Sequence, residues 1–381
     1  MTRRASRKAR PVFSYGFSAL RQRSRHCNNE HVTDDLDRYR QQMRLAPIGA
    51  EGQRRLRDSH ALIVGCGALG SVAIEQLARA GVGRLTIVDR DVVDESNLQR
   101  QVLYDEDNAR RATPKAEAAK ARVAKINSSV NVRAWYDDFA PRNAMRYIEG
   151  VHVIVDGLDN LETRYLLNDL AVRTGIPYVY GAAVGTEGMC AVIRPGVTPC
   201  LRCVFPELPP AGLIATCDTA GVLGSLTALV ASLEVTQAIK LLVGAATSVE
   251  PGLLAIDLWR NTWRRIDTGT RDPACPCCAR REFAFLEGDR IPTTTVFCGR
   301  DAVQIAPRMS RVVDLDSLER RLASLGSFKR SPDRLTGVLA DERSSSGLPL
   351  ELTVFSDGRI LLRGSQEPEL ARAIAARFVG T

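Results

Sequence analysis

The feature that most constrains this chain is a glycine-rich turn between an apolar strand and a helix. The apolar segment 61–64 runs directly into GCGALG at residues 65–70, after which apolar residues recur at near-helical spacing as far as residue 80. Two glycines end that pattern, and a second apolar strand is expected over residues 84–89. A strand, a tight turn, a helix and a second strand form a unit whose strands are parallel. The sequence therefore predicts an α/β domain with a doubly wound, Rossmann-like sheet.

Further segments extend this pattern as far as about residue 284. Short apolar segments bounded by turn residues predict strands at 151–157, 176–181, 188–193, 252–258 and 263–266. Helices are expected over 34–58, 161–173 and 220–244. The last of these is the most apolar, but its uncharged run is shorter than the ~18 residues that a membrane-spanning helix needs. We therefore expect no membrane span.

The pattern changes in the C-terminal part of the chain. Amphipathic helices are expected at 314–326 and 369–379, and the alternating segment 351–364 predicts a β-hairpin that turns at Asp357-Gly358. The chain is therefore expected to have three parts: a disordered basic tail over 1–33, a nucleotide-binding α/β domain over 34–284, and a small α+β module of unassigned role over 285–381.

The positive charge of the chain is concentrated at one end. The formal net charge is +8, and residues 1–30 contain eight Lys or Arg against the single acid Glu30. Because the remaining residues are close to neutral, the charge does not indicate a body that binds a specific nucleic acid. The basic segment is typical of a disordered arm or an over-long translation start, and a transit peptide is the alternative. We expect a cytoplasmic protein.

Ten cysteines are present, without the secretory leader that a disulfide framework would imply. Four of them form two Cys-x-x-Cys pairs, Cys200 with Cys203 and Cys275 with Cys278. Each pair presents two thiolates from one tight turn, and together they complete a closed tetrahedral site of the kind that holds structural zinc. Cys277 lies inside the second pair and is an alternative ligand.

The glycine turn is a candidate phosphate-binding site. Its glycines let the backbone approach a phosphate, and the N-terminus of the next helix supplies N–H groups and a positive dipole end. Asp89 ends the second strand, where a carboxylate accepts hydrogen bonds from ribose hydroxyls. Arg100 and Lys115 follow, and such cations stabilise the pyrophosphate that leaves when an α-phosphorus is attacked. Surface salt bridges are the alternative for both cations.

Two more candidate residues follow later elements. Asp159 comes after the strand expected at 151–157, where open α/β sheets bind ligands, and a carboxylate beside phosphates suits Mg²⁺. The alternative is that Asp159 caps the next helix. Cys217 precedes the long helix, and a helix N-terminus lowers the pKa of a thiol. A buried, unreactive cysteine is the alternative there. The four histidines have no acidic partner at a recognisable spacing, so we expect structural roles for them.

Together these residues resemble the adenylyltransferases that activate sulfur carriers, the ThiF, MoeB and HesA group related to ubiquitin-activating enzymes. The resemblance covers about residues 34–280. It is carried by RYRQQ (38–42), LIVGCGALG (62–70), AGVGRLTIVDRDVVDESNLQRQ (80–101), Pro114-Lys115, DGLDN (156–160), CLRC (200–203), TCDTAGVLGS (216–225) and CPCC (275–278). It implies the Rossmann-like sheet of the ubiquitin-activating-enzyme type with a zinc site.

The resemblance also implies roles for individual residues. The backbone of the turn would hold ATP at Gly65, Gly67, Ala68 and Gly70. The ribose, the phosphates and Mg²⁺ would be bound by Asp89, Ser96, Asn97, Arg100, Lys115, Asp159 and Asn160. The zinc ligands would be Cys200, Cys203, Cys275 and Cys278. Cys217 matches the cysteine that takes the carrier's C-terminal glycine as a thioester, or sulfur as an acyl persulfide.

The chain departs from the family pattern at two positions. Ala68 stands where the family often has a second glycine, which a backbone contact to the nucleotide tolerates. Near residue 40 the family has Tyr-x-Arg-Gln, with the arginine reaching the partner subunit's ATP. Gln41 occupies the position of that arginine, with Arg40 and Arg44 as neighbours, so the residue that replaces it stays open.

These observations lead to one hypothesis and three alternatives, one of which is a nucleic-acid binder that uses the basic tail alone. The protein would adenylylate the C-terminal Gly-Gly carboxylate of a ubiquitin-like carrier with Mg·ATP, and a separate sulfur donor would then form a thiocarboxylate for thiamine or molybdopterin biosynthesis. The resemblance also implies a homodimer. A dinucleotide-binding oxidoreductase explains the glycine turn but not Lys115, Asp159 or the cysteine pairs. A catalytically inactive scaffold would usually have lost the phosphate-binding cations.

Overall fold

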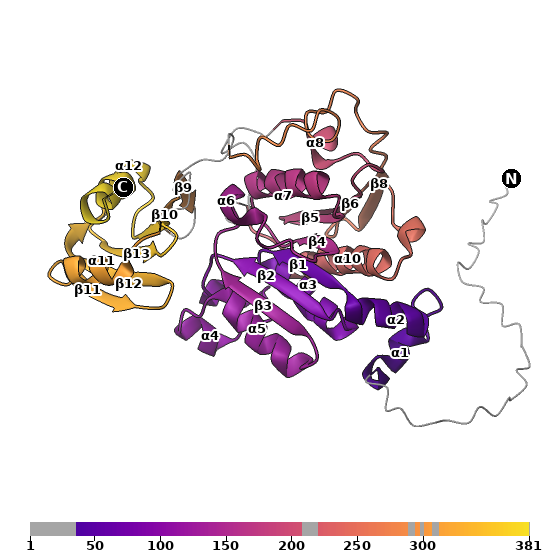
Figure 1. Ribbon diagram of the computed structural model, residues 1–381, viewed down its shortest axis with the longest axis horizontal. Coiled ribbons are helices and arrows are strands. Elements are labelled where there is room, and N and C mark those ends of the chain that lie inside the picture. The colour runs from indigo at the N-terminus through magenta and orange to yellow at the C-terminus, as the bar shows by residue number, and fades with distance from the viewer. Residues whose placement is uncertain (1–35, 208–219, 289–293, 298–300, 307–311, 381) are drawn as a thin grey trace, which may run out of the picture. The chain divides into compact units, whose positions relative to one another are not determined.

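A computed structural model describes residues 36–207, 220–288, 294–297, 301–306 and 312–380. The chain divides into two compact units, Met1–Arg38 and Tyr39–Thr381. The first unit includes the predicted basic tail, which lies outside the described residues. The second unit contains two β-sheets with their helices (Figure 1).

The larger sheet has eight strands in the order β3-β2-β1-β4-β5-β6-β7-β8. Their bounds are β1 (His60–Val64), β2 (Arg84–Asp89), β3 (Asn131–Tyr136), β4 (Val153–Asp156), β5 (Tyr178–Val184), β6 (Glu187–Ile193), β7 (Leu253–Asp257) and β8 (Thr262–Ile266). The pairs from β3 to β5 are parallel, and those from β5 to β8 are antiparallel. The predicted Rossmann-like sheet is confirmed, with an antiparallel extension on one side.

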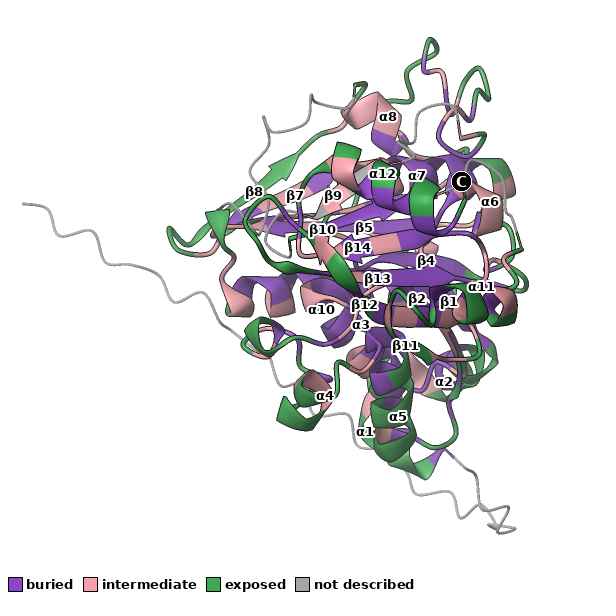
Figure 2. Cartoon of the chain, turned by 90° about the vertical axis from the view of Figure 1, so that its left-hand side faces the viewer, coloured by how far each residue is buried: buried purple, intermediate pink, exposed green. Residues whose placement is uncertain are grey.

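Helices cover both faces of this sheet. The long ones are α3 (Ala68–Ala80), α5 (Lys115–Ile126), α7 (Leu161–Thr174) and α10 (Gly224–Leu242). In β1, Ala61 and Ile63 belong to the core cluster formed with α3, α5 and α10, whereas Leu62 and Val64 belong to the cluster formed with α7. Because neighbouring residues of a strand point to opposite faces, β1 is apolar throughout. The central strands are buried, and α4 and α5 present exposed outer faces (Figure 2).

Shorter helices complete this part of the chain. They are η1 (Asp37–Tyr39), α1 (Arg40–Met43), α2 (Gly49–Asp58), η2 (Glu95–Asn97), α4 (Glu106–Arg110), α6 (Pro141–Ala144), α8 (Leu201–Val204) and η3 (Ala246–Ser248). The helical region expected over 34–58 is therefore interrupted, and Pro47 lies in the break between α1 and α2. Helix α10 is long and apolar enough to cross a membrane by length and composition alone. It contacts α3, β4, β5 and β6, which accounts for its apolar character.

The smaller sheet is antiparallel and has the order β11-β12-β13-β14-β10-β9. Its strands are β9 (Thr294–Phe297), β10 (Ala302–Ile305), β11 (Gly326–Arg330), β12 (Arg334–Arg343), β13 (Pro349–Phe355) and β14 (Ile360–Arg363). Helices α11 (Leu315–Leu322) and α12 (Pro368–Phe378) share a separate apolar core with this sheet. The predicted hairpin is β13–β14, and Gly358 in its turn has a φ of +90°.

Candidate functional site

Two glycines of the turn between β1 and α3 are required by packing. A Cβ on Gly65 would lie 2.4 Å from the carbonyl oxygen of Gly157, and its φ is +90°. A Cβ on Gly70 would lie 1.9 Å from the carbonyl oxygen of Gly65. Both distances are shorter than any that real Cβ atoms show, so these positions accept only glycine. The turn therefore lies tightly against the residues that follow β4.

Gly67 has the opposite environment. The nearest atoms to a Cβ built there are 3.9 Å away, on Gln101 and Gly157. Gly67 is also the N-cap of α3, and no side chain caps this helix end. The first N–H groups of a helix have no partner within the helix, and its positive dipole end attracts anions. The half-buried helix start at Gly67 and Ala68, where a Cβ would meet only ordinary contacts, therefore suits the approach of a phosphate group.

Asp89 fastens the turn to the end of β2. Its carboxylate accepts hydrogen bonds from the backbone N–H groups of Cys66 and Asp91, both at 2.6 Å. Burial raises the pKa of the Asp89 carboxyl, while the charge of Lys115 and the two N–H donors oppose this shift. The carboxylate is thus held rigidly beside the turn, in the position expected for a ribose-binding group.

Lys115, the first residue of α5, lies within electrostatic range of Asp89. Its side chain is buried, and its Nζ lies 3.2 Å from Oδ2 of Asp91. The Lys115 backbone N–H also donates to the Asp91 carbonyl at 2.9 Å. Asp91 was not predicted as a site residue, although it stands in the D-R-D segment that follows β2. The structure therefore brings two predicted residues together and adds the acid that orients the lysine.

The segment after Asp91 forms the short helix η2. The side chain of Asp94 caps it by accepting from the Ser96 N–H and hydroxyl, at 2.9 and 2.6 Å. Asn97 is buried, and its Oδ1 accepts from the Asp94 N–H at 3.3 Å. In this structure the Ser96 and Asn97 side chains therefore shape the segment itself. Arg100 donates to the Ser96 carbonyl at 3.0 Å.

The same segment adds a residue that the sequence did not reveal. Gln101 is buried, and its Oε1 has no hydrogen-bond partner among the described residues. Its amide nitrogen is the side-chain atom nearest to a Cβ built on Gly67. Buried polar atoms are usually paired, so the unpaired Oε1 of Gln101, whose amide nitrogen lies near Gly67, is a candidate ligand contact. Arg100 lies farther along, with its Cβ 3.5 Å from a Cβ built on Gly224 at the start of α10.

The residues after β4 have clearly separate roles. Asp156 is fully buried and binds Tyr178, Arg164 and the Leu158 N–H, so its carboxylate is occupied within the fold. The N-cap of α7 is Asn160, whose Oδ1 accepts from the Thr163 N–H at 2.9 Å. The capping alternative for Asp159 is therefore wrong. Asp159 is exposed, and its charge acts on Arg90 and Arg164. A carboxylate in this place fits Mg²⁺.

Four cysteines form a compact cluster beside α8. The Sγ atoms of Cys200, Cys203, Cys275 and Cys278 all lie within 4.8 Å of one another. Three of the separations are 3.9, 3.6 and 3.4 Å. Tetrahedral zinc with Zn–S bonds of about 2.3 Å places its sulfur atoms about 3.8 Å apart, so the cluster fits zinc.

Cys277 lies outside this cluster. It is fully buried, and its Sγ accepts a hydrogen bond from the Asn168 amide at 3.3 Å. A hydrogen bond from the Cys277 thiol is the main cause that lowers the pKa of Cys200 to about 4. The four cysteines that could hold a metal ion are thus those of the two predicted pairs, without Cys277.

The comparison with known proteins agrees with this geometry. The model of the ThiF family matches residues 39–277. The chain belongs to the ThiF family. It is 40% identical over 344 residues to the sulfur carrier protein ThiS adenylyltransferase of Bacillus subtilis, covering 90% of this chain and 99% of that relative. It is also 40% identical to the sulfur carrier protein adenylyltransferase of Thermus thermophilus, over 70% of this chain and 97% of that relative.

Two further similarities cover smaller parts of this chain or of the other protein. The adenylyltransferase and sulfurtransferase MOCS3 of Sus scrofa is 38% identical over 79% of this chain, and the match covers 64% of that relative. The crystal structure of E. coli MccB with ATP has a TM-score of 0.54 and 21% identity, covering 64% of this chain and 74% of that one. The structural likeness shows the fold, and the named relatives identify the ThiF-family protein as an adenylyltransferase.

The cysteines and histidines of the ThiF-family protein outside the cluster have different environments. Cys217, the predicted nucleophile, lies outside the described residues. Burial raises the pKa of Cys66 and of Cys190 well above that of a free thiol, so neither is a reactive thiolate. His60 is buried against Thr86 Oγ1 and the Gly150 carbonyl, and His152 accepts from the His60 N–H. These two histidines have the structural environments that we expected.

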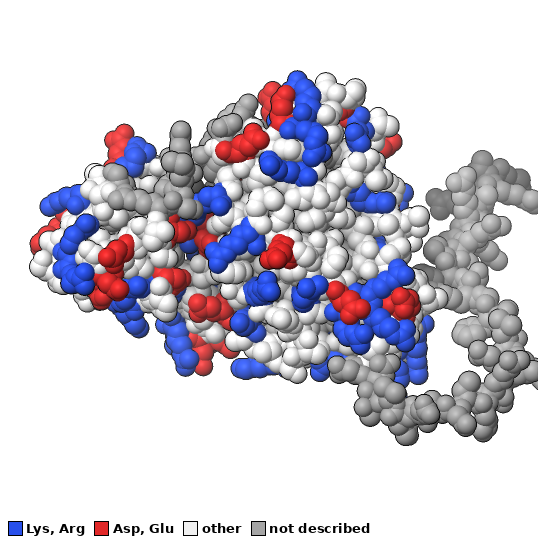
Figure 3. Space-filling view, viewed as in Figure 1, with Lys and Arg blue, Asp and Glu red and all other residues white. Residues whose placement is uncertain are grey.

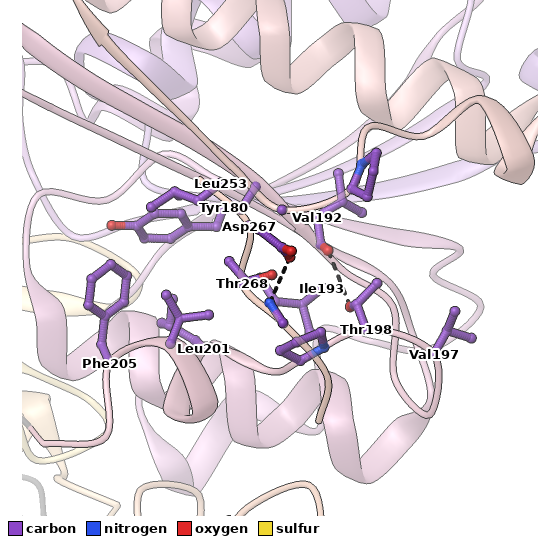
Figure 4. A pocket seen from close by; sticks show the side chains of 16 residues that line it. Tyr180, Val192, Ile193, Val197, Thr198, Leu201, Phe205, Leu253, Asp267 and Thr268 are labelled. Atoms are coloured by element: carbon purple, nitrogen blue, oxygen red, sulfur yellow. Dashed lines mark hydrogen bonds between the residues drawn. The ribbon is translucent and has the colours of Figure 1, made fainter. Parts of the chain in front are cut away.

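A cavity of about 210 Å³ in the ThiF-family protein is lined in part by Pro199 and Leu201, the two neighbours of Cys200 in the chain (Figure 4). Tyr180, Leu201 and Phe205 form part of its apolar lining, with Asp267 and Thr268 on another side. Its lining includes none of the predicted nucleotide-binding residues, so the open position at Gly67 is separate from it. On the face drawn in Figure 3, Lys and Arg are interspersed with Asp and Glu. That face therefore has no extended patch of one sign.

Proposed function

We propose that this ThiF-family adenylyltransferase activates the C-terminal carboxylate of a ubiquitin-like sulfur carrier that ends in Gly-Gly. The observation that carries the proposal is the uncapped N-terminus of α3 at Gly67, next to Asp89, which binds the Cys66 N–H and lies within electrostatic range of the buried Lys115. A glycine that packing does not require, next to a buried lysine and a rigid carboxylate, is the arrangement that a nucleoside phosphate needs. The names of the relatives supply the carrier as the second substrate.

The chemistry needs no base from the protein. A carboxylate oxygen of the carrier attacks the α-phosphorus of ATP, the bond to the β-phosphate oxygen breaks, and pyrophosphate leaves with the bonding electrons. The product is an acyl-adenylate. Lys115 and Arg100 would neutralise charge that develops on the phosphates, because fixed cations act strongly in a partly buried site. Asp159 would hold Mg²⁺, which adds positive charge on the phosphate oxygens.

The extent of the matches favours a carrier of the ThiS type. A match over 344 of the 381 residues leaves 37 unmatched, so it reaches at least residue 344, in the smaller sheet. The SAMP-activating enzyme of Haloferax volcanii matches over only 243 residues, although these are 88% of its length. The match covers 99% of the ThiS adenylyltransferase relative but 64% of the MOCS3 relative of Sus scrofa, which supports a ThiS-type carrier.

Other features complete the proposal. Sulfur from a separate donor would replace AMP on the activated carrier and give a thiocarboxylate, with Cys217 as the residue that links carrier or sulfur covalently. The four-cysteine cluster would hold structural zinc. The protein would act as a cytoplasmic homodimer, and Arg40 or Arg44 would replace the arginine expected at position 41.

The test is ATP–pyrophosphate exchange with a purified ThiS-type or MoaD-type carrier. We expect exchange with the ThiS-type carrier, and its loss when the carrier lacks its last glycine. Asp159→Ala should abolish exchange, whereas Asp107→Ala, an exposed aspartate of α4, should retain it. Cys217→Ala should also retain exchange but lose thiocarboxylate formation. Binding of NAD with no binding of ATP would refute the proposal and support an oxidoreductase.

A further inference from the structure

The cysteine cluster is built from two turns that are distant in sequence. The first turn, residues 200–203, includes most of α8, which contacts α7 and lies beside it (Figure 1). The second turn, residues 275–278, follows the last strand of the larger sheet. A four-thiolate zinc site needs both turns at one fixed spacing, because each supplies two of the four tetrahedral ligands. A residue that binds both turns can therefore set that spacing.

Asn168 of α7 makes such a connection. Its Oδ1 accepts from the backbone N–H of Leu201, the residue after Cys200 in the first turn, at 2.8 Å. Its amide nitrogen donates to Sγ of Cys277, inside the second turn, at 3.3 Å. Because the Leu201 N–H can only donate, Oδ1 must face it, which directs the amide nitrogen to Cys277. Asn168 is fully buried, so both hydrogen bonds are shielded from solvent.

Two neighbours of Asn168 on α7 bind the flanks of the same turns. The Tyr165 hydroxyl donates to the Phe205 carbonyl, just after the first turn, at 2.7 Å. The Asp169 carboxylate accepts from the Phe285 N–H, beyond the second turn, at 2.9 Å. Both side chains are buried. The buried face of α7 is thus a common support for the two turns, and Asn168 is the residue that binds within each of them.

We propose that Asn168 is a positioning residue of the metal site, which fixes the two cysteine turns at the spacing that a tetrahedral zinc ion requires. An amide held on a helix reduces the conformational freedom that the turns lose when the metal binds. Removing a residue that orients metal ligands typically weakens metal binding about 10- to 100-fold. The inference rests on the proposed zinc site, and it assigns no ligand role to Asn168 itself.

The test measures the affinity of the full chain for zinc, by competition with a chromophoric chelator. Asn168→Ala should raise the Kd for zinc by about tenfold or more. The matched control is Asn127→Ala, which removes another buried amide, bonded to the Tyr39 hydroxyl and the Ala78 carbonyl at 2.7 and 2.8 Å. Asn127→Ala should lower Tm but bind zinc with the Kd of the wild type.

Two further measurements separate positioning from the loss of a ligand. Co²⁺ bound to Asn168→Ala should keep the absorption spectrum of a tetrahedral four-thiolate site, because all four cysteines remain, whereas Cys278→Ser should change it. Cys277→Ala keeps the bond between Asn168 and Leu201, so it should raise the Kd for zinc by only about threefold. This variant also tests the inference if Asn168→Ala does not fold. The two changes together should weaken zinc binding little more than Asn168→Ala alone.

The results that contradict the inference differ from those that contradict the zinc site. A wild type that binds zinc, with an unchanged Kd in Asn168→Ala and in Cys277→Ala, would overturn the inference alone. So would an equal rise in Kd for Asn127→Ala, which would indicate general destabilisation, or a changed cobalt spectrum in Asn168→Ala. A wild type that binds no zinc would overturn the proposed zinc site together with the inference.

Discussion

Replacing Gly67 by alanine tests whether this glycine is required for stability of the fold or for binding of ATP. A methyl group at this position meets nothing closer than 3.9 Å, which is ordinary van der Waals contact. The φ of Gly67 is −77°, so alanine causes no left-handed strain. The expected stability cost is that of a poorer N-cap, below about 1 kcal/mol, or a fall in Tm of less than about 4 °C.

The effect on ATP should be much larger. The methyl group would stand beside the N-terminus of α3 and keep a phosphate from the helix N–H groups. Losing one charge-assisted hydrogen bond costs about 1.5–3 kcal/mol, which corresponds to about a 10- to 100-fold rise in Kd. Calorimetric titration with ATP, and thermal melts of the apo protein, measure the two effects separately.

Gly70→Ala is the matched comparison. Its Cβ would lie 1.9 Å from the Gly65 carbonyl oxygen, where real contacts are essentially never under 3.0 Å. Backbone must therefore move, and we expect a loss of about 3 kcal/mol or more, with a clear fall in Tm before any nucleotide is added. If Gly67→Ala melted like Gly70→Ala, or bound ATP as tightly as the wild type, the assignment of Gly67 to ligand approach would be refuted.

Two further predictions concern the rest of the chain. Cys278→Ser should lose bound zinc and lower Tm strongly, because a structural zinc contributes on the order of 10 kcal/mol to folding, whereas Cys277→Ser should keep about one zinc per chain by elemental analysis. Glu234 is fully buried on α10, neither carboxylate oxygen has a partner within the described part of the chain, and burial raises its pKa well above 4.5. A raised pKa stabilises the fold below the unfolded-state pKa, and this stability is lost as pH rises through the folded-state pKa. Glu234→Gln should therefore raise Tm at pH about 8 and change it little at pH about 4; an equal gain at both would contradict this.

The central fold followed from the sequence because its signals are local. The apolar run of β1, the turn glycines and the strand ending at Asp89 occur within about thirty residues, and each has a direct physical reason. β3 was not predicted. At the edge of the parallel part, Val132 is its one buried residue and the others are exposed or partly buried, so it lacks the continuous apolar run of the inner strands. The strands at the start of the smaller sheet were missed as well.

The candidate site followed from the sequence only where residues act through their own chemistry. Lys115 and Asp159 were named because a cation and an exposed carboxylate suit phosphates and magnesium. Asp91 and Gln101 were missed because their roles depend on what they face: Asp91 faces the buried Nζ of Lys115, and the Gln101 amide nitrogen lies near Gly67. A glutamine between an arginine and a valine gives no signal until its environment is known.

The connection between the two sheets depends on residues far apart in sequence. Asp138 and Gln304 are separated by 166 positions, and an Asp-Asp pair after a strand is typical of a solvated loop. In the structure, Asp137 and Asp138 instead bind Arg359 and Gln304 of the smaller sheet, and Asp138 also binds Arg90. A chain cut after residue 284 would retain every motif residue of the nucleotide site. It would nevertheless remove the partners that hold these two acids, and Arg90 would lose its fixed geometry. The smaller sheet therefore helps to fix the loop that follows β3, and experiments on ATP use should compare the full chain with the shortened one.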